Sequence, residues 1–341
     1  MSIINIIIPF IILISVVVFV HEYGHYYYAK KYGVKVTDFS IGFGKELFGW
    51  TDKDGTRWKV CLIPLGGYVK FFGDMNPASQ PQKLSTFSEK EKSQLLATKK
   101  LYQRAIIVSA GPVANFVLAL VIFSCVYMFF GKDFSVPVIQ DVKIDSPAYK
   151  AGIKKGDQII RINDQTITSM MEVSQFISLS DTNLIKISVL RDKKEYDFQV
   201  QSIIQDTKDN LGNNISRKMI GIQIIPLNNE INRQKLGPAK AIYYSLKEIW
   251  FTISSTMSYV GKMIIGTEKA DQLGGPIKIA QISGQVAELG VIPFLSIMAY
   301  ISISLGLINL FPIPLLDGGH LLFYFYEFIR GKHLSEKVQT Y

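Results

Sequence analysis

Three long stretches of this chain contain no charged side chain, and they constrain its fold more than any other feature. They cover residues 1–20, 105–130 and 289–316. Each is long enough to cross a bilayer core as a helix, which takes about 20 residues. Residues 1–20 lack the positive start and the small-residue cleavage site of a signal peptide, so we expect a retained membrane helix. Because 19% of the chain is still charged, we also expect a water-exposed domain.

The charge distribution predicts the orientation of the chain in the membrane. Residues 27–104 contain fourteen Lys and Arg against seven Asp and Glu, so the positive-inside rule places them in the cytoplasm. The N-terminus then faces outside, as do residues 131–235, where short β-rich runs (185–190 and 198–204) alternate with turns. The net charge of +9 fits such a protein, and no basic segment outside the membrane flanks is interleaved with aromatics, so we expect no nucleic-acid partner.

Residues 21–25 read His-Glu-Tyr-Gly-His and fit the pattern H-E-x-x-H. Two histidines at i and i+4 share one helix face, so His21 and His25 can bind one zinc ion, with Glu22 as general base. Zinc lowers the pKa of a bound water to about 7, which gives a nucleophile at neutral pH. The alternative is a pair of interfacial histidines at a helix end, but ionisable residues at membrane depth are costly and usually functional.

Two carboxylates compete to be the third zinc ligand. Glu46 stands near the distance at which thermolysin-like sites carry a glutamate, but its Gly-rich surroundings contain no helix to orient it. Asp317 lies in residues 309–319, whose two prolines and two glycines should break a helix. Broken backbone at membrane depth is tolerated where it is buried in protein or lines a cavity, which favours Asp317. The alternative for Asp317 is an N-cap of the following helix.

Two motifs, on the first and third uncharged stretches, together resemble the site-2 protease family of intramembrane zinc metalloproteases, and within it most closely the bacterial regulator of sigma-E protease. They are His21-Glu22-x-x-His25 and Asn309-x-x-Pro312-x-Pro314-x-x-Asp317-Gly318. The resemblance implies a Zn²⁺ cofactor with His21, His25 and Asp317 as ligands and Glu22 as the catalytic base. Asn309 would hold the substrate or the developing oxyanion, with Pro312 also in the substrate site.

Three further segments resemble the same family. Residues 62–71 are similar to its membrane-entering β-hairpin, in which Gly66, Gly67 and Tyr68 would bind an unwound substrate as an added strand; a surface hairpin with a Gly-Gly turn is the alternative. Asn115, in Gly111-Pro112-x-x-Asn115-Phe116, would support the site by positioning the hairpin or by satisfying a helix contact. Residues 138–203 resemble a PDZ domain, marked by the motif at 146–157, which reads Ser-Pro-Ala-x-x-Ala-Gly-x-x-x-Gly-Asp. Such a domain would filter substrates in the periplasm; its ligand is not predicted.

The resemblance implies an α-helical membrane protein with a membrane-associated β-hairpin and one α+β PDZ domain, where this branch often has two. Three membrane segments are visible, and a fourth is expected past the C-terminus. The predicted parts are a first membrane helix with the zinc motif (1–28), a cytoplasmic region with the hairpin (29–104), a second membrane helix (105–130), the PDZ domain (131–235), an amphipathic helix with a connector (236–288), a third membrane segment (289–330) and a cytoplasmic tail (331–341).

The function implied is cleavage of single-span membrane proteins, of the anti-sigma-factor or remnant-signal-peptide class, in the lipid of a bacterial inner membrane. Two alternatives stay open. A non-catalytic PDZ adaptor would not need Glu22. A metal transporter would use His21, His25 and Asp317 as a transit site and would leave the PDZ domain without a role.

Overall fold

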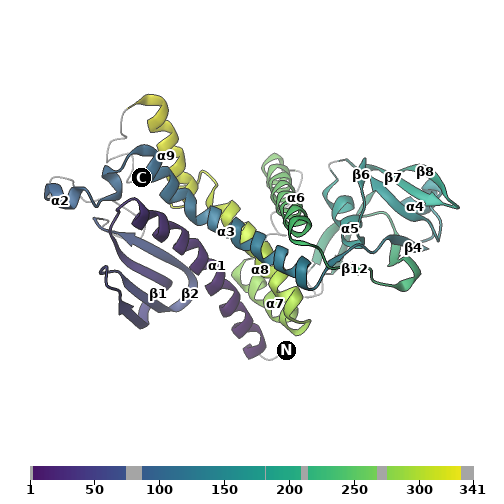
Figure 1. Ribbon diagram of the computed structural model, residues 1–341. Coiled ribbons are helices and arrows are strands. Elements are labelled where there is room, and N and C mark those ends of the chain that lie inside the picture. Colours follow the sequence, from purple (N-terminus) through teal and green to yellow (C-terminus); the bar gives the residue numbers. More distant parts are fainter. Residues whose placement is uncertain (1–2, 74–86, 181, 209–213, 267–274, 332–341) are drawn as a thin grey trace. The chain divides into compact units, whose positions relative to one another are not determined.

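The computed structural model describes residues 3–73, 87–180, 182–208, 214–266 and 275–331 (Figure 1). The chain divides into two compact units. The first contains residues 1–123, 245–253 and 275–341, and the second contains residues 124–244 and 254–274. The expected fourth membrane segment past the C-terminus lies outside the described residues.

Among the described residues, three helices are long and apolar enough to cross a membrane, and they coincide with the three uncharged stretches. They are α1 (Ile3–Lys31), α3 (Leu101–Phe129) and α8 (Val291–Asn309). Helix α1 continues beyond its apolar run without a break, so His21 and His25 stand on the same rigid element as the membrane segment. The predicted helix break is confirmed, because α8 ends at Asn309 and a new helix, α9 (Asp317–Arg330), begins at Asp317.

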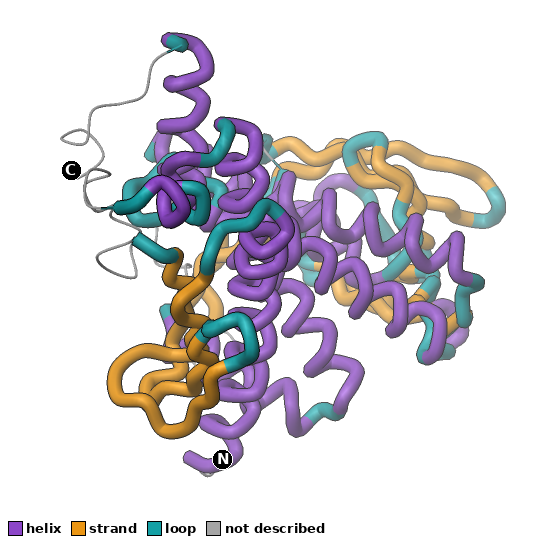
Figure 2. The backbone as a smooth tube through the Cα atoms, turned by 60° about the vertical axis from the view of Figure 1, so that its left-hand side comes forward, coloured by secondary structure: helices purple, strands orange, loops and turns teal. Residues whose placement is uncertain are grey.

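Two long antiparallel strands, β1 (Val36–Thr51) and β2 (Arg57–Phe71), follow α1 and curl on themselves (Figure 2). Residues 38–41 pair on one side with residues 57–60 and on the other with residues 67–70. The alternative of a turn at Gly66 and Gly67 is wrong, because both lie inside β2. The strands are joined at residues 52–56, where the Asp52 carboxylate accepts the backbone N–H groups of Asp54 and Thr56 and so closes the turn. The last residues of β2 therefore form an outer edge of this curled sheet.

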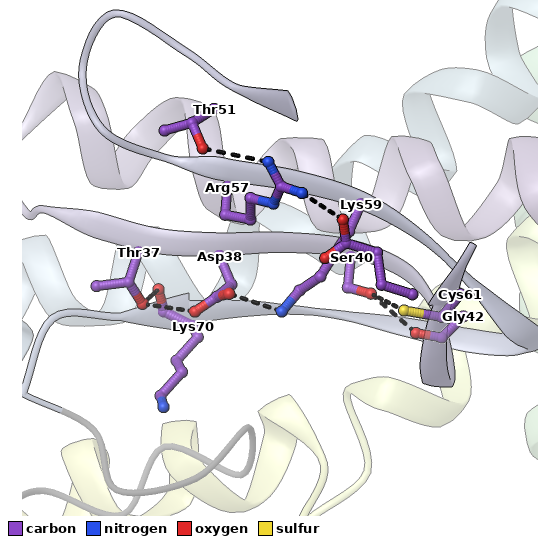
Figure 3. Close-up of polar contacts among 10 residues, drawn as sticks. Thr37, Asp38, Ser40, Gly42, Thr51, Arg57, Lys59, Cys61 and Lys70 are labelled. Atoms are coloured by element: carbon purple, nitrogen blue, oxygen red, sulfur yellow. Dashed lines mark hydrogen bonds and ion pairs between the residues drawn. The ribbon is translucent and has the colours of Figure 1, made fainter. Parts of the chain in front are cut away.

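Side chains of the curled β1–β2 sheet fix its register. The Lys59 ammonium donates to the Asp38 carboxylate at 2.6 Å across the strands (Figure 3). Within β1, the Ser40 hydroxyl donates to the Gly42 carbonyl at 3.0 Å. The rings of Phe39 and Trp58 stack with centroids 4.3 Å apart, a geometry that aromatic pairs favour. This packing holds the sheet as a defined surface beside α1.

Three further helices of the first unit were not predicted as separate elements. Helix α7 (Pro276–Glu288) forms where a connector was expected. It packs against the start of α1 through Gly284, where a Cβ atom would lie 2.9 Å from the Asn5 carbonyl oxygen. The short helices α2 (Glu89–Lys92) and η2 (Leu96–Thr98) precede α3.

The second unit is built on an antiparallel sheet in the order β11-β4-β5-β7-β8, with β6 paired to β5. The sheet strands are β4 (Pro137–Val142), β5 (Gln158–Ile162), β6 (Gln165–Thr166), β7 (Leu184–Arg191), β8 (Lys194–Gln201) and β11 (Ile222–Pro226), and its helices are α4 (Pro147–Ala151) and α5 (Met170–Leu179). Outside the sheet lie β3 (Lys132–Asp133) paired with β12 (Arg233–Gln234), β9 (Ile203–Lys208) paired with β10 (Asn214–Met219), and η3 (Leu227–Asn229). The run at 185–190 is confirmed as β7, whereas the run at 198–204 divides between β8 and β9.

The motif at 146–157 has a local explanation in the second unit. Ser146 caps α4 by accepting the Tyr149 N–H, and Gly152 ends α4 with a φ of 89°. The buried Asp157 carboxylate accepts two hydrogen bonds from the Arg191 guanidinium, at 2.6 and 2.7 Å. Within residues 236–288, where an amphipathic helix and a connector were predicted, the structure has the helix α6 (Pro238–Ile265).

Candidate metal centre

Two side chains of α1 and the first residue of α9 bring three potential ligand atoms together. The Nε2 atoms of His21 and His25 lie 3.3 Å apart. The Oδ2 atom of Asp317 lies 3.3 Å from the first and 3.4 Å from the second. Within the described residues, these side chains form a group whose ligand atoms lie close enough to hold a metal ion. The two sequence segments expected to share one site therefore meet.

The geometry of this group fits a zinc ion. Ligands about 2.0–2.2 Å from a tetrahedral zinc lie about 3.3–3.5 Å from one another, which matches all three separations. Oδ2 of Asp317 is buried and makes no hydrogen bond within the described residues, so its lone pairs are available. Two imidazoles and one carboxylate leave the fourth position of a catalytic zinc site open.

The segment before Asp317 sets the position of its carboxylate. Leu316 occupies the N-cap, and Asp317 is the first helical residue, so the N-cap alternative for Asp317 is wrong. A Cβ atom at Gly318 would lie 2.2 Å from the Phe311 carbonyl oxygen, so only glycine lets the chain fold back this closely. Leu315 adopts a φ of 75°, a conformation that costs a non-glycine residue about 1 kcal/mol or more.

Helix α3 contributes no ligand, yet it contacts both imidazoles. Nδ1 of His25 lies 2.9 Å from the Ile107 carbonyl oxygen, and Nδ1 of His21 lies 3.2 Å from the Asn115 side-chain nitrogen. A Cβ atom at Gly111 would lie 2.2 Å from His25 Nε2. Asn115 thus contacts a helix residue, as one of its two predicted roles requires. Sequence reasoning quoted Gly111 as part of the motif that contains Asn115 but assigned it no role, and it missed Ile107, whose contact is made by a backbone carbonyl.

The two remaining candidate carboxylates, Glu22 and Glu46, differ in their position relative to the histidines. Glu22 is buried on α1 beside the two histidines, and a Cβ atom at Gly67 of β2 would lie 3.1 Å from its Cγ atom. Glu46 lies on β1, where the Arg57 guanidinium donates to it at 2.5 Å. It is not one of the three grouped side chains, so Asp317 is the better candidate for the third ligand.

The predicted substrate residues lie on two segments. The Asn309 side-chain nitrogen is 3.4 Å from His21 Nε2, and Pro312 is exposed in the break between α8 and α9. Gly66 and Tyr68 both face Phe43: a Cβ atom at Gly66 would lie 2.6 Å from that ring, and the Tyr68 ring stacks on it. In the predicted hairpin, Gly67 packs closely against the Glu22 side chain, and the Val69 backbone hydrogen-bonds to its carboxylate.

Comparison with known proteins identifies relatives over nearly the whole chain. The model of "Peptidase family M50" matches residues 9–341. A protein of Agrobacterium fabrum named "Putative zinc metalloprotease" is 41% identical over 98% of this chain and 89% of its own length. A Rickettsia conorii protein of the same name is 39% identical over 98% and 92%. "Metalloprotease MmpA" of Caulobacter vibrioides is 32% identical over 96% and 88%.

A solved structure, the PDZ domain of an SdrC-like protein from Listeria monocytogenes, covers 27% of this chain and 90% of that chain. It is 22% identical with a TM-score of 0.22, a likeness too low to support an argument. The family match and the sequence relatives are sufficient on their own. This chain belongs to peptidase family M50, the site-2 protease family.

Proposed function

We propose that this protein is a zinc-dependent intramembrane protease whose zinc ligands are His21, His25 and Asp317. The observation that carries the proposal is the triangle of their three ligand atoms, with edges of 3.3 to 3.4 Å, at the end of a membrane helix. The zinc ion, when bound, supplies a Lewis acid that activates water and polarises a peptide carbonyl. The names of the Agrobacterium fabrum and Rickettsia conorii relatives agree with this cofactor.

Two polar side chains beside the ligands would carry out the proton and charge steps. Glu22 is buried next to His21 but is not one of the three grouped residues, so its carboxylate is available as a base. It would take the proton of the attacking water and deliver it to the leaving nitrogen. The Asn309 amide, 3.4 Å from His21 Nε2, would donate to the carbonyl oxygen as negative charge develops there.

The edge of β2 offers a way to present an extended substrate. A helical substrate shields its peptide bonds, so it must unwind before attack. Within the described residues, the segment at 67–71 pairs with another strand on its β1 side only, and the Val69 backbone hydrogen-bonds to the Glu22 carboxylate. A substrate strand added to the unpaired edge would therefore lie beside Glu22. Gly67 brings this strand against Glu22. We infer that a single-span membrane protein, of the anti-sigma-factor or remnant-signal-peptide class, binds here with Gly66, Tyr68 and Pro312 nearby.

The second unit would select substrates as a PDZ domain on the periplasmic side. Support comes from the antiparallel sheet with two short helices and from the motif at 146–157, where Ser146, Gly152 and Asp157 each have a structural role. The excess of Lys and Arg between residues 27 and 104 supports a cytoplasmic location for that segment and a bacterial inner-membrane location for the chain. We retain the division of the chain into parts that was predicted from the sequence, with the PDZ domain at residues 131–235, as part of this proposal.

The test is Glu22→Gln in the full chain, reconstituted with a model single-span substrate. This substitution keeps the shape of the side chain but removes its basic carboxylate, so cleavage should stop while zinc content stays at about one ion per chain. Glu89→Gln, at an exposed glutamate of α2, is the matched control and should cleave normally. Normal cleavage by Glu22→Gln would refute the base assignment. Failure of a zinc chelator to stop the wild-type protein would refute the proposed function, and zinc uptake into proteoliposomes would indicate the transporter.

A further inference from the structure

Two residues of α3 contact the imidazoles of α1 and constrain which ring nitrogen of each histidine carries the proton. A neutral histidine that binds a metal through Nε2 must carry its hydrogen on Nδ1. For His25 this is enforced, because Nδ1 faces the Ile107 carbonyl oxygen at 2.9 Å, and a carbonyl can only accept. The lone pair of His25 Nε2 is therefore directed at the shared ligand position.

For His21 the corresponding partner is the Asn115 side chain, 3.2 Å from Nδ1. An amide can offer either its oxygen or its nitrogen. If its nitrogen donated to Nδ1, the proton of His21 would sit on Nε2, the atom that lies 3.3 Å from both His25 Nε2 and Asp317 Oδ2. That arrangement would block the ligand position. If the amide oxygen accepts from Nδ1–H, both histidines present lone pairs to one point.

The side-chain amide of Asn115 can adopt either orientation, while packing and a backbone hydrogen bond hold the residue in place. Its side chain is fully buried, and its Oδ1 atom has no hydrogen-bond partner within the described residues, so turning the amide breaks no bond to that oxygen. Its backbone carbonyl accepts from the Ser302 hydroxyl of α8 at 2.9 Å. A Cβ atom at Gly306 would lie 3.3 Å from Asn115 Cβ, so α8 packs directly on this residue.

We propose that Asn115 is a positioning residue whose amide oxygen accepts the Nδ1 hydrogen of His21 and so commits His21 Nε2 to the metal. The inference rests on the proposed zinc site. Residues that hydrogen-bond to metal-binding histidines in this way typically change metal affinity by about 10–100-fold when they are removed.

The test compares Asn115→Leu with Asn115→Asp by competition for zinc against a chromophoric chelator, using purified full chain. Leucine keeps the volume but accepts no hydrogen bond, so zinc affinity should fall about 10–100-fold. Aspartate keeps an acceptor, so the affinity should stay at or above the wild-type value. A packing role alone predicts the opposite order, because leucine fits and a buried carboxylate is costly. Ser109→Ala removes a hydroxyl that, among the described residues, donates to the Ile106 carbonyl of its own helix, and it should leave zinc affinity unchanged.

Spectra of the zinc-loaded wild type keep the proposal testable if a variant fails to fold. The chain has four histidines, and in ¹⁵N-histidine spectra two of them should be protonated at Nδ1 and metal-bound at Nε2. Equal zinc affinity of Asn115→Leu and wild type, or a site histidine protonated at Nε2, would overturn the assignment to Asn115 while leaving the zinc site intact. A wild-type protein that binds no zinc would instead refute the proposed function.

Discussion

Replacing Gly111 by alanine should disable zinc binding through a single added methyl group. The new Cβ atom would lie 2.2 Å from His25 Nε2 and 2.9 Å from His21 Cε1. Ordinary contacts begin at 3.4 Å, so the His25 ring would have to retreat by about 1.2 Å. Metal–ligand distances tolerate only about 0.2 Å, and a misplacement of about 1 Å in an active site can cost about 100-fold in rate. We therefore expect zinc affinity to fall by about 100-fold or more.

The assay is zinc competition on the purified full-length variant, with helix content followed by circular dichroism. Gly261→Ala is the matched control, because Gly261 lies inside α6 with nothing within 4 Å of the added atom. Alanine there should leave zinc affinity unchanged and favour the helix by about 1 kcal/mol. If Gly111→Ala bound zinc as tightly as the wild type, the imidazoles would not be confined by α3, and the account of the site given above would be refuted.

Three further perturbations test other parts of the structure. Asp317→Asn removes the ligand charge and should lower zinc content measured by atomic absorption; unchanged stoichiometry would remove Asp317 from the site. Glu327→Gln leaves the buried Arg104 guanidinium without the carboxylate that lies 2.5 Å from it. It should lower the free energy of unfolding, measured by denaturant titration, by about 3–5 kcal/mol. A change below about 1 kcal/mol would show that the pair is dispensable. Burial raises the pKa of the Asp52 carboxyl, but hydrogen bonds from Trp58 and from backbone N–H groups outweigh burial and lower this pKa below 3.8. The β1–β2 hairpin should therefore lose this stabilisation only as pH falls below about 4, which Trp fluorescence would report. A transition near pH 6 would contradict this cause.

The sequence was most informative where hydrophobic length and a fixed spacing decide the structure. The uncharged stretches predicted α1, α3 and α8, and the i, i+4 histidines predicted two imidazoles on one helix face. The proline–glycine break predicted where α9 begins. The residues alone favoured Asp317 over Glu46, because no helix orients Glu46 and broken backbone at membrane depth indicates a site. The resemblance added the expectation that Asp317 shares one metal with His21, because nothing local in the sequence shows that segments nearly 300 residues apart meet.

The features that were missed depend on contacts between distant elements. Helix α7 is set by its close packing on α1 at Gly284, which no helical periodicity reveals. The curled pairing of β1 with β2 arises because residues 38–41 pair on both sides with parts of β2, whereas in a simple hairpin each strand pairs with the other on one side. The roles of Ile107 and Arg104 depend on a backbone carbonyl and on a partner 223 residues away, and neither leaves a motif.

Helix α3 emerges as the frame of the site, although it supplies no metal ligand. Its residues Arg104, Ile107, Gly111 and Asn115 follow one another at intervals of three, four and four, so they lie along one face of the helix. Arg104 pairs with Glu327 near the end of α9, and the Ile107 carbonyl accepts a hydrogen bond from His25. Gly111 leaves space for both imidazoles, and Asn115 contacts His21. Because α9 begins with Asp317 and pairs with Arg104 through Glu327, the same face of α3 positions all three candidate ligands. A metal site assembled from separate membrane segments needs such a common reference, since ligands placed independently on α1 and α9 would not keep a separation of 3.3 to 3.4 Å.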